Sequence, residues 1–342
     1  MAQLGPLRKV VVLRASRIGD FVCATPALRA LRAAACEAEI TLVTLPLLRE
    51  LAERCPDVDR FAPFPGFPGL AEQLFDPRAA TTFFQAMQAE QFDLAIQLQG
   101  SGVHSNPFTL MLGAQHTAGF VRPGEEPSRL LAAALPLPQS GHEIDRVLAL
   151  VRFLGAPAAG RTTRYELWPA DHAEAERLLA SASAAARPLV GLHPGAWDAE
   201  RRWPVDRFAA LGRALRARYG ATLVILGSHS EQRRTADLAA ALDGACLNLG
   251  GQTGLGSVGA VIARLALLVT NDSGPAHIAY ALRTPTVTVA HGCDQERYGP
   301  PLSGPFSLVH PPKTDRGGLA RLPLDPVLSA AVALLEEYRR VC

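Results

Sequence analysis

Two series of short apolar runs, each run followed by a helical stretch, constrain the fold of this chain more than any other feature. The first series opens with residues 9–14, KVVVLR, and the second opens with residues 189–193, LVGLH. Apolar and β-branched residues at successive positions suit a strand buried on both faces, as in a parallel sheet covered by helices. The alternation therefore predicts an α/β fold built from two βαβ units.

The two series are expected to form two domains, since domains usually contain roughly 100 to 200 residues and this chain has 342. Small residues at 156–161, APAAGR, are suited to a linker. We place an N-terminal domain at 1–160, a C-terminal domain at 161–324 and a last amphipathic helix at 325–342. From its residues alone, that helix can pack on either domain.

The remaining elements follow from apolar periodicity and from turn-forming residues. Thr25 and Pro26 predict the start of the first helix, because a threonine cap followed by proline is a common helix start. The aromatic, glycine-rich stretch 64–70 and the proline-rich stretch 123–138 are expected to be loops. The further strand candidates are residues 40–45, 60–64, 92–98, 116–121, 221–227, 266–270 and 286–290.

The charge and the longest apolar runs exclude several classes of protein. The formal net charge is +2, and acidic and basic residues are nearly balanced in both halves, which argues against a nucleic-acid binder. No apolar run approaches the ~20 residues that span a bilayer. Arg14 and Arg17 interrupt the first apolar run before it reaches the length of a signal-peptide core. We therefore expect a cytoplasmic protein.

The cysteines and histidines do not form a metal-binding pattern. The six cysteines are dispersed without a C-x-x-C pair, and the histidines show no H-E-x-x-H. In a cytoplasmic chain, such cysteines are expected to be free thiols in or near the core. We predict no structural metal.

The first strand runs into residues 14–21, RASRIGDF, a strand-loop-helix junction with a carboxylate at Asp20. Ligands of open α/β sheets bind at such junctions, beyond the carboxyl ends of the strands. Asp20 can act there as a general base, or it can stabilise the start of a helix through the helix dipole. Both interpretations stay open from this segment alone.

The second series opens with another junction, residues 193–204, HPGAWDAERRWP. A turn of small residues after a strand leaves backbone N–H groups for an anion, and the two arginines at 201 and 202 can bind phosphate oxygens in a forked geometry. A pair of charges near a helix start is often exposed to solvent. The alternative interpretation is therefore that the two arginines are surface charges that bind no phosphate.

Two further junctions carry polar groups. Residues 270–277, TNDSGPAH, place Asp272, Ser273 and Gly274 at a helix start, where unpaired N–H groups favour a phosphate. Helix capping alone explains part of this pattern. Residues 226–231, LGSHSE, place a carboxylate where the hydroxyls of a ribose could be bound.

One glycine motif is set aside. Residues 254–259, GLGSVG, match G-x-G-x-x-G, but they follow a glycine-rich loop, and no suitable acid follows about 20 residues later. We interpret them as a glycine-rich helix start, which disfavours a nicotinamide-dependent oxidoreductase.

In their order and spacing, these motifs resemble the ADP-heptose:lipopolysaccharide heptosyltransferases of glycosyltransferase family nine. The segments that carry the resemblance are 19–20 with 25–28 (TPAL), 93–100, 118–120, 193–196 with 201–204, 227–231 and 270–277. Each motif is weak alone, whereas the ordered set is specific and extends over nearly the whole chain.

The resemblance implies a GT-B fold, in which two Rossmann-like domains face each other across a cleft and the last helix crosses back to the first domain. It implies inverting, metal-independent transfer of a heptose from ADP-heptose, with no cofactor. By the same matching, Asp20 is the catalytic base, and Arg201 is a second catalytic residue at the position of a lysine found in many members. Either Arg201 replaces that lysine directly, or Arg202 shares the phosphate role. The implied donor-binding residues are His193, Gly195, Ala196, Arg202, Glu231, Asp272, Ser273, Gly274 and His277.

The acceptor is expected to be a saccharide hydroxyl, of lipopolysaccharide core or a related glycan, that is lipid-linked and reached at the inner face of the cell membrane. The sequences of residues 64–70 and 101–104 differ from those of members that act on the inner core. Another donor, or a soluble or protein acceptor, therefore stays open. A GT-B epimerase or hydrolase is a further alternative. The candidate acceptor-binding residues are Arg14, Arg17, Gly19, His104 and Arg122.

Overall fold

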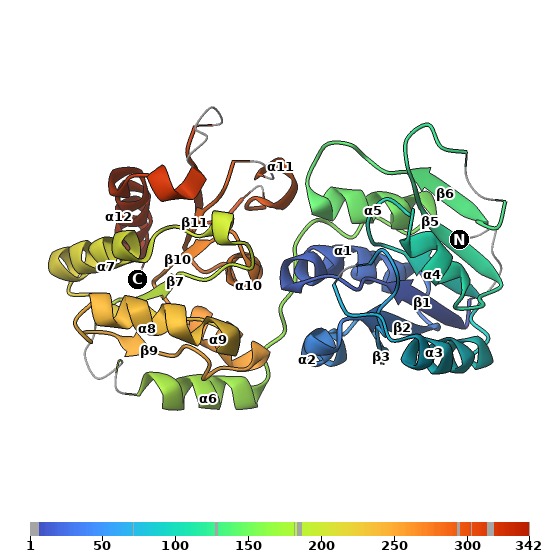
Figure 1. Cartoon of the computed structure of the whole chain (residues 1–342), viewed down its shortest axis with the longest axis horizontal. Helices are drawn as coiled ribbons and strands as arrows, with labels where there is room; N and C mark the ends of the chain where they lie inside the picture. Colours follow the sequence, from blue (N-terminus) through green and yellow to red (C-terminus); the bar gives the residue numbers. More distant parts are fainter. Residues whose placement is uncertain are drawn as a thin grey trace. The chain divides into compact units, whose positions relative to one another are not determined.

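The computed structural model describes residues 7–70, 72–126, 129–180, 182, 187–292, 295–301, 303–312 and 318–341. The chain divides into two compact units, a first unit at Met1–Arg164 and a second unit at Tyr165–Cys342 (Figure 1). The division lies within a few residues of the boundary predicted at residue 160. Cys293 and Cys342 fall outside the described residues; of the other four cysteines, Cys23 and Cys55 are buried, Cys246 is partly buried and Cys36 is exposed.

Within its described residues, the first unit is a six-stranded parallel sheet in the order β3-β2-β1-β4-β5-β6. The middle strand is fully buried from Val10 to Leu13, as its apolar sequence predicts. Its strands are β1 (Lys9–Leu13), β2 (Glu39–Thr44), β3 (Arg60–Pro63), β4 (Leu94–Gln97), β5 (His116–Val121) and β6 (Ala133–Pro136). Its helices are α1 (Ile18–Ala34), α2 (Arg49–Arg54), α3 (Pro77–Ala89), α4 (Ser105–Leu110) and α5 (Glu143–Phe153).

Helix α1 begins earlier than predicted, at Ile18, so Pro26 lies inside it. A proline within a helix removes the hydrogen bond to the carbonyl four residues earlier. Here the Thr25 hydroxyl donates to that carbonyl, of Val22, at 2.8 Å, which replaces the lost donor. The earlier start puts Asp20 in the first turn of the helix.

The second unit repeats the architecture. Its described residues form a parallel sheet in the order β12-β11-β10-β7-β8-β9. Its strands are β7 (Leu189–His193), β8 (Thr222–Ile225), β9 (Leu247–Asn248), β10 (Leu267–Asn271), β11 (Thr286–Val289) and β12 (Phe306–Val309). Its α-helices are α6 (Pro169–Leu179), α7 (Val205–Tyr219), α8 (Gln232–Ala241), α9 (Leu255–Ile262), α10 (Gly274–Leu282), α11 (Gln295–Tyr298) and α12 (Leu324–Val341).

The glycine motif at 254–259 is a helix start, as interpreted from its context. Gly254 precedes α9, and its N–H donates to the Ser257 hydroxyl at 2.9 Å. Gly259 lies so close to the Tyr165 ring that a Cβ would overlap it. Both glycines therefore serve helix capping and packing in this unit.

The last helix differs from its expected position. We expected it to cross back onto the N-terminal domain, but the apolar side of α12 packs on α7 and on strands β10, β11 and β12 of the second unit. Val327, Ala331 and Leu335 are fully buried there, in the same hydrophobic core as Leu211 and Val289. The helix thus completes the core of the second unit. No helix in the described residues is both long and apolar enough to cross a membrane.

Candidate active site

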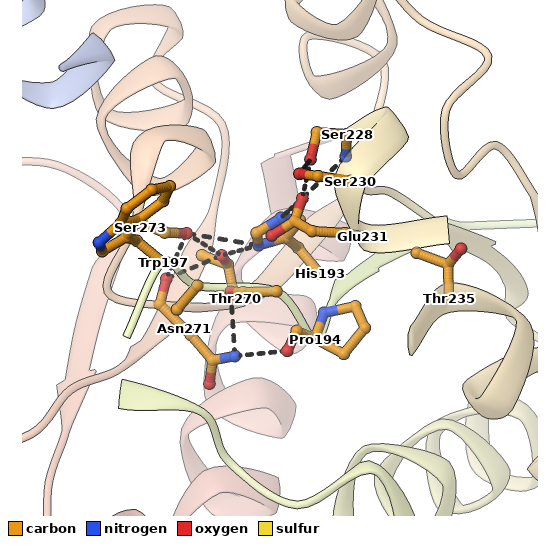
Figure 2. Close-up of polar contacts among 12 residues, drawn as sticks. His193, Pro194, Trp197, Ser228, Ser230, Glu231, Thr235, Thr270, Asn271 and Ser273 are labelled. Atoms are coloured by element: carbon orange, nitrogen blue, oxygen red, sulfur yellow. Dashed lines mark hydrogen bonds and ion pairs between the residues drawn. The ribbon is translucent and has the colours of Figure 1, made fainter. Parts of the chain in front are cut away.

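The polar groups of the second unit gather at the carboxyl ends of three neighbouring strands. β10, β7 and β8 are adjacent in the sheet, so the segments that follow them meet at one edge. Figure 2 shows His193 between Glu231 on one side and Thr270 and Ser273 on the other. The three junctions chosen from the sequence are therefore brought together.

His193, the last residue of β7, is the centre of this cluster and is only 2% exposed. Its Nδ1 lies 3.1 Å from the Thr270 hydroxyl and 3.3 Å from the Ser273 hydroxyl. Its Nε2 lies 3.5 Å from Oε2 of Glu231. Both ring nitrogens thus face polar groups of neighbouring strand ends.

Glu231 ends a short 3₁₀ turn, η3 (His229–Glu231). Its Oε2 accepts hydrogen bonds from the Ser228 N–H at 2.8 Å and from the Ser228 hydroxyl at 2.7 Å. Burial by itself would raise the pKa of Glu231, but the contact with His193 and the two bonds from Ser228 lower it to about 2. The carboxylate is therefore ionised at neutral pH. A Cβ at Gly195 would overlap this carboxylate, so a larger residue there would displace the end of the Glu231 side chain.

The loop after β7 is held through four consecutive carbonyl oxygens. Asn271 Nδ2 donates to the carbonyls of Pro194 at 2.9 Å and Gly195 at 3.1 Å. Arg202 donates to the carbonyls of Ala196 at 2.7 Å and Trp197 at 3.0 Å. Within the described chain, the N–H groups of Gly195 and Ala196 have no acceptor. A turn with bound carbonyls and available N–H groups is a site for an anion.

The two neighbouring arginines have different positions. Arg202 is occupied with the loop carbonyls, as described above. Arg201 Nη1 lies 3.4 Å from Oδ2 of Asp272, and its side chain is 38% exposed. Arg201 is therefore the one that reaches the turn between β10 and α10, where a phosphate was expected.

Helix α10 begins at Gly274, directly after Ser273. Pro275 suits its first turn, because proline has no N–H group and the first N–H groups of a helix have no partner within it. His277 is buried one turn further, with its ring edge-on to Tyr280 and Tyr298 at centroid distances of 5.7 and 6.2 Å. The ring therefore has a packing role in this unit, and its contact with a diphosphate stays a prediction.

In the first unit, Arg14 joins Asp20 to a second carboxylate. Arg14 Nη2 donates to Asp20 Oδ1 at 2.8 Å and to Glu143 Oε1 at 2.9 Å, and Nη1 donates to the carbonyl of Leu98. Arg14 and Glu143 are almost fully buried, whereas the Asp20 side chain is 22% exposed. The guanidinium of Arg14 is thus buried and positions Asp20, and its contact with an acceptor stays a prediction.

The other predicted acceptor residues lie at the surface of the first unit. Arg17 pairs with Glu72 at 3.1 Å, and Arg122 lies 3.7 Å from Glu125. His104 packs against Gly69, in the aromatic loop, so closely that a Cβ on that glycine would overlap the imidazole. Gly19 is half-buried beside Asp20 in α1.

Sequence reasoning did not assign roles to Asn271, Ser228, Thr270 or Glu143. The first three stand within or beside the motifs. A polar residue at the buried end of a strand needs a hydrogen-bond partner, and this signal could have indicated their roles. Glu143 stands far from Asp20 in the chain and gave no local signal. No group of three or more potential metal ligands occurs among the described residues.

Comparisons with known proteins agree with this arrangement. The sequence profile of glycosyltransferase family 9 (heptosyltransferase) matches residues 80–305. Lipopolysaccharide heptosyltransferase 2 of Salmonella typhimurium is 28% identical over 307 residues, which cover 86% of each chain.

Two solved structures share the fold. The family 9 glycosyl transferase from Veillonella parvula superimposes with a TM-score of 0.82 at 21% identity, covering 96% of this chain and 97% of that one. The ADP-heptose LPS heptosyltransferase II of E. coli superimposes with a TM-score of 0.76 at 23% identity, covering 97% and 99%. The predicted GT-B class, with two Rossmann-like units, is confirmed. The family profile spans well over half of this chain, which therefore belongs to glycosyltransferase family 9, the heptosyltransferase family.

Proposed function

We propose that this enzyme is an inverting, metal-independent heptosyltransferase that transfers a heptose from ADP-heptose to a hydroxyl of a lipopolysaccharide core saccharide or a related glycan. The relatives named above are lipopolysaccharide heptosyltransferases, and one of them carries ADP-heptose in its name. The observation that carries the proposal is the loop at Gly195 and Ala196 with its two available N–H groups, in the unit where Arg201 reaches the turn before α10.

The second unit supplies the groups that a nucleoside diphosphate needs. The two loop N–H groups, the start of α10 and Arg201 would bind the diphosphate oxygens. Hydrogen bonds to charged groups contribute about 1.5 to 3 kcal/mol each, so two or three of them can stabilise a leaving diphosphate substantially. This positive charge can replace the metal that many nucleotide-sugar reactions need. The ionised Glu231 would accept hydrogen bonds from the ribose hydroxyls.

The first unit supplies the base. In the proposed reaction, Asp20 takes the proton of the acceptor hydroxyl while that oxygen forms a bond to the anomeric carbon. The bond from that carbon to the diphosphate breaks, and its electron pair leaves on the diphosphate oxygen. Attack from the side opposite the leaving group inverts the anomeric configuration. Arg14 fixes one Asp20 oxygen at 2.8 Å, which orients the carboxylate for this step.

The acceptor we propose is lipid-linked and is reached at the cytoplasmic face of the membrane, which makes the enzyme peripheral to that surface. The exposed cations Arg17 and Arg122 suit an anionic saccharide. A soluble or protein acceptor is the alternative outcome of the experiment below.

The test measures ADP release from ADP-heptose with core saccharides, a soluble glycan and a protein as acceptors. We expect release with the core saccharide, loss of at least about a thousandfold in Asp20→Asn, and unchanged ADP binding by that variant. Asp145→Asn is the matched control, because Asp145 also lies in the first turn of a helix and pairs with an arginine, Arg161. Absence of both ADP binding and ADP release would overturn the proposal, and full activity in Asp20→Asn would overturn the assignment of the base.

A further inference from the structure

Trp197, in the loop after β7, is 81% exposed, more than any other large apolar residue described in the second unit. The other two tryptophans of the chain are more protected, since Trp203 is fully buried and Trp168 is 48% exposed. Tryptophan has a large apolar ring, and such rings are mostly covered by other atoms in folded proteins. The exposed ring of Trp197 is therefore a candidate for contact with a ligand.

The backbone that carries this ring is fixed on both sides. On one side, Arg202 donates to the carbonyls of Ala196 at 2.7 Å and Trp197 at 3.0 Å. On the other side, the Asp198 carboxylate accepts an N–H of the 3₁₀ turn η2 (Ala199–Arg201) at 3.0 Å. A ligand that covers the ring therefore has little backbone to order, which lowers the entropic cost of binding.

The ring lies at the end of the loop that is away from Glu231. Gly195, near the start of the loop, packs so closely against the Glu231 carboxylate that a Cβ would overlap it. Figure 2 shows the Trp197 indole on the same side of His193 as Ser273, with Glu231 on the opposite side. The two ends of the loop therefore face different parts of a ligand that is bound across it.

The order of groups in the proposed donor matches this direction. In ADP-heptose, the diphosphate joins the ribose to the heptose. We have placed the ribose at Glu231 and the diphosphate at the N–H groups of Gly195 and Ala196. The heptose then extends from the other end of the diphosphate, toward the side on which Trp197 lies.

That side of the site offers the two kinds of group that a sugar ring needs. A sugar has hydroxyls around its edge and C–H groups on its faces, so it fits a polar acceptor combined with an apolar aromatic surface. Asp272, next to Ser273 in the chain, has a carboxylate that is only 14% exposed and can accept from hydroxyls. The indole of Trp197 supplies the apolar surface.

We propose that Trp197 binds the heptose of the donor by packing its indole on the C–H groups of one face of the sugar. The inference rests on the proposed function, because it concerns the sugar end of the same donor site. It makes Trp197 a residue that recognises ADP-heptose through its sugar and contributes little to the binding of ADP.

Titration calorimetry of the intact protein with ADP-heptose and with ADP tests this role. Trp197→Ala should weaken binding of ADP-heptose at least about fivefold and change binding of ADP less than about twofold, because ADP has no sugar to contact the ring. Trp197→Phe should retain most of the affinity, since phenylalanine also has an apolar ring face. Trp168→Ala is the matched control at the other exposed tryptophan of the second unit, and it should leave both affinities unchanged.

Acrylamide quenching of tryptophan fluorescence shows directly whether the ring is covered. In Trp168→Phe only Trp197 and Trp203 remain, and Trp203 is fully buried, so quenching reports Trp197. We expect quenching to fall when ADP-heptose saturates the protein and to stay the same with ADP. This measurement leaves Trp197 itself unaltered, so it does not depend on the folding of a variant at that position.

The outcomes separate this inference from the proposed function. Binding of ADP-heptose that is unchanged in Trp197→Ala, or equal losses for ADP-heptose and ADP, would overturn the contact with the sugar while leaving the transferase proposal intact. Quenching that ADP-heptose leaves unchanged would also overturn it. No binding of ADP-heptose by the unaltered protein would overturn the proposed function, and the role of Trp197 with it.

Discussion

Asn271 holds the loop after β7, residues 194–197, which we call the donor loop. The loss of stability on removing its side chain can be calculated. Its side chain is fully buried at the end of β10 and joins three segments. Nδ2 donates to the carbonyls of Pro194 and Gly195, and Oδ1 accepts the N–H of Trp203 at 2.9 Å. Asn271→Ala removes all three bonds and leaves buried backbone groups without partners.

The magnitude follows from these three bonds. A hydrogen bond contributes about 0.5 to 1.5 kcal/mol net, and a buried group left without a partner costs about 1 to 3 kcal/mol. Trp203 is fully buried, so its N–H gains no water in exchange. We expect the unfolding free energy of the second unit to fall by about 2 to 4 kcal/mol, and the affinity for ADP to fall as the loop loosens.

Urea denaturation followed by tryptophan fluorescence measures this loss, because all three tryptophans, Trp168, Trp197 and Trp203, belong to the second unit. Asn248→Ala is the matched control: its side chain is partly exposed and accepts one bond, from the Gly250 N–H at 2.9 Å. That variant should lose no more than about 1 kcal/mol. If Asn271→Ala loses as little as the control, the loop is not held in the way described here.

Three further variants test neighbouring contacts. Gly195→Ala should weaken ADP binding at least about tenfold in calorimetry, because its Cβ overlaps the Glu231 carboxylate. Glu143→Gln should lower kcat several-fold with little change in the KM for the donor, because Arg14 loses its ion pair with Glu143 and then holds Asp20 more tightly. The stability that the ionised Glu231 confers is complete above pH 4.5 and is lost as pH falls toward about 2, so the difference in unfolding free energy between wild type and Glu231→Gln should shrink across that range.

The sequence predicted the two sheets because their central strands contain runs of apolar residues, as in Val10–Leu13, a pattern typical of strands buried on both faces. Of the four short edge strands it predicted β3, at residues 60–64, and did not show the other three. β6 lies in a proline-rich stretch expected to be a loop, and β9 and β12 are two and four residues long. Edge strands pair on one side only and need less apolar sequence, so periodicity is weak there.

The side chains of the site also divide into those that the sequence located and those that it did not. His193 and Glu231 were assigned correctly to one place, because each follows a strand and parallel strands end at a common edge. The position of Arg14 was not predictable from its own segment. Its burial depends on Glu143 and on the Leu98 carbonyl, which come from distant parts of the chain. Long-range ion pairs of this kind leave no periodic signal in a single sequence.

The roles of the arginines explain why one of them can serve the ligand. A guanidinium has five N–H donors in a fixed plane, so it can bind several oxygens of its own chain at once. Arg14 binds two carboxylates and a carbonyl in this way, and Arg202 binds two carbonyls of the donor loop. Moving either one would disrupt the structure that forms the site. Arg201 is different, because its contact with Asp272 is long, at 3.4 Å, and its side chain is more than a third exposed. Of the two arginines that precede Trp203, Arg201 is therefore the one that we propose to bind the diphosphate.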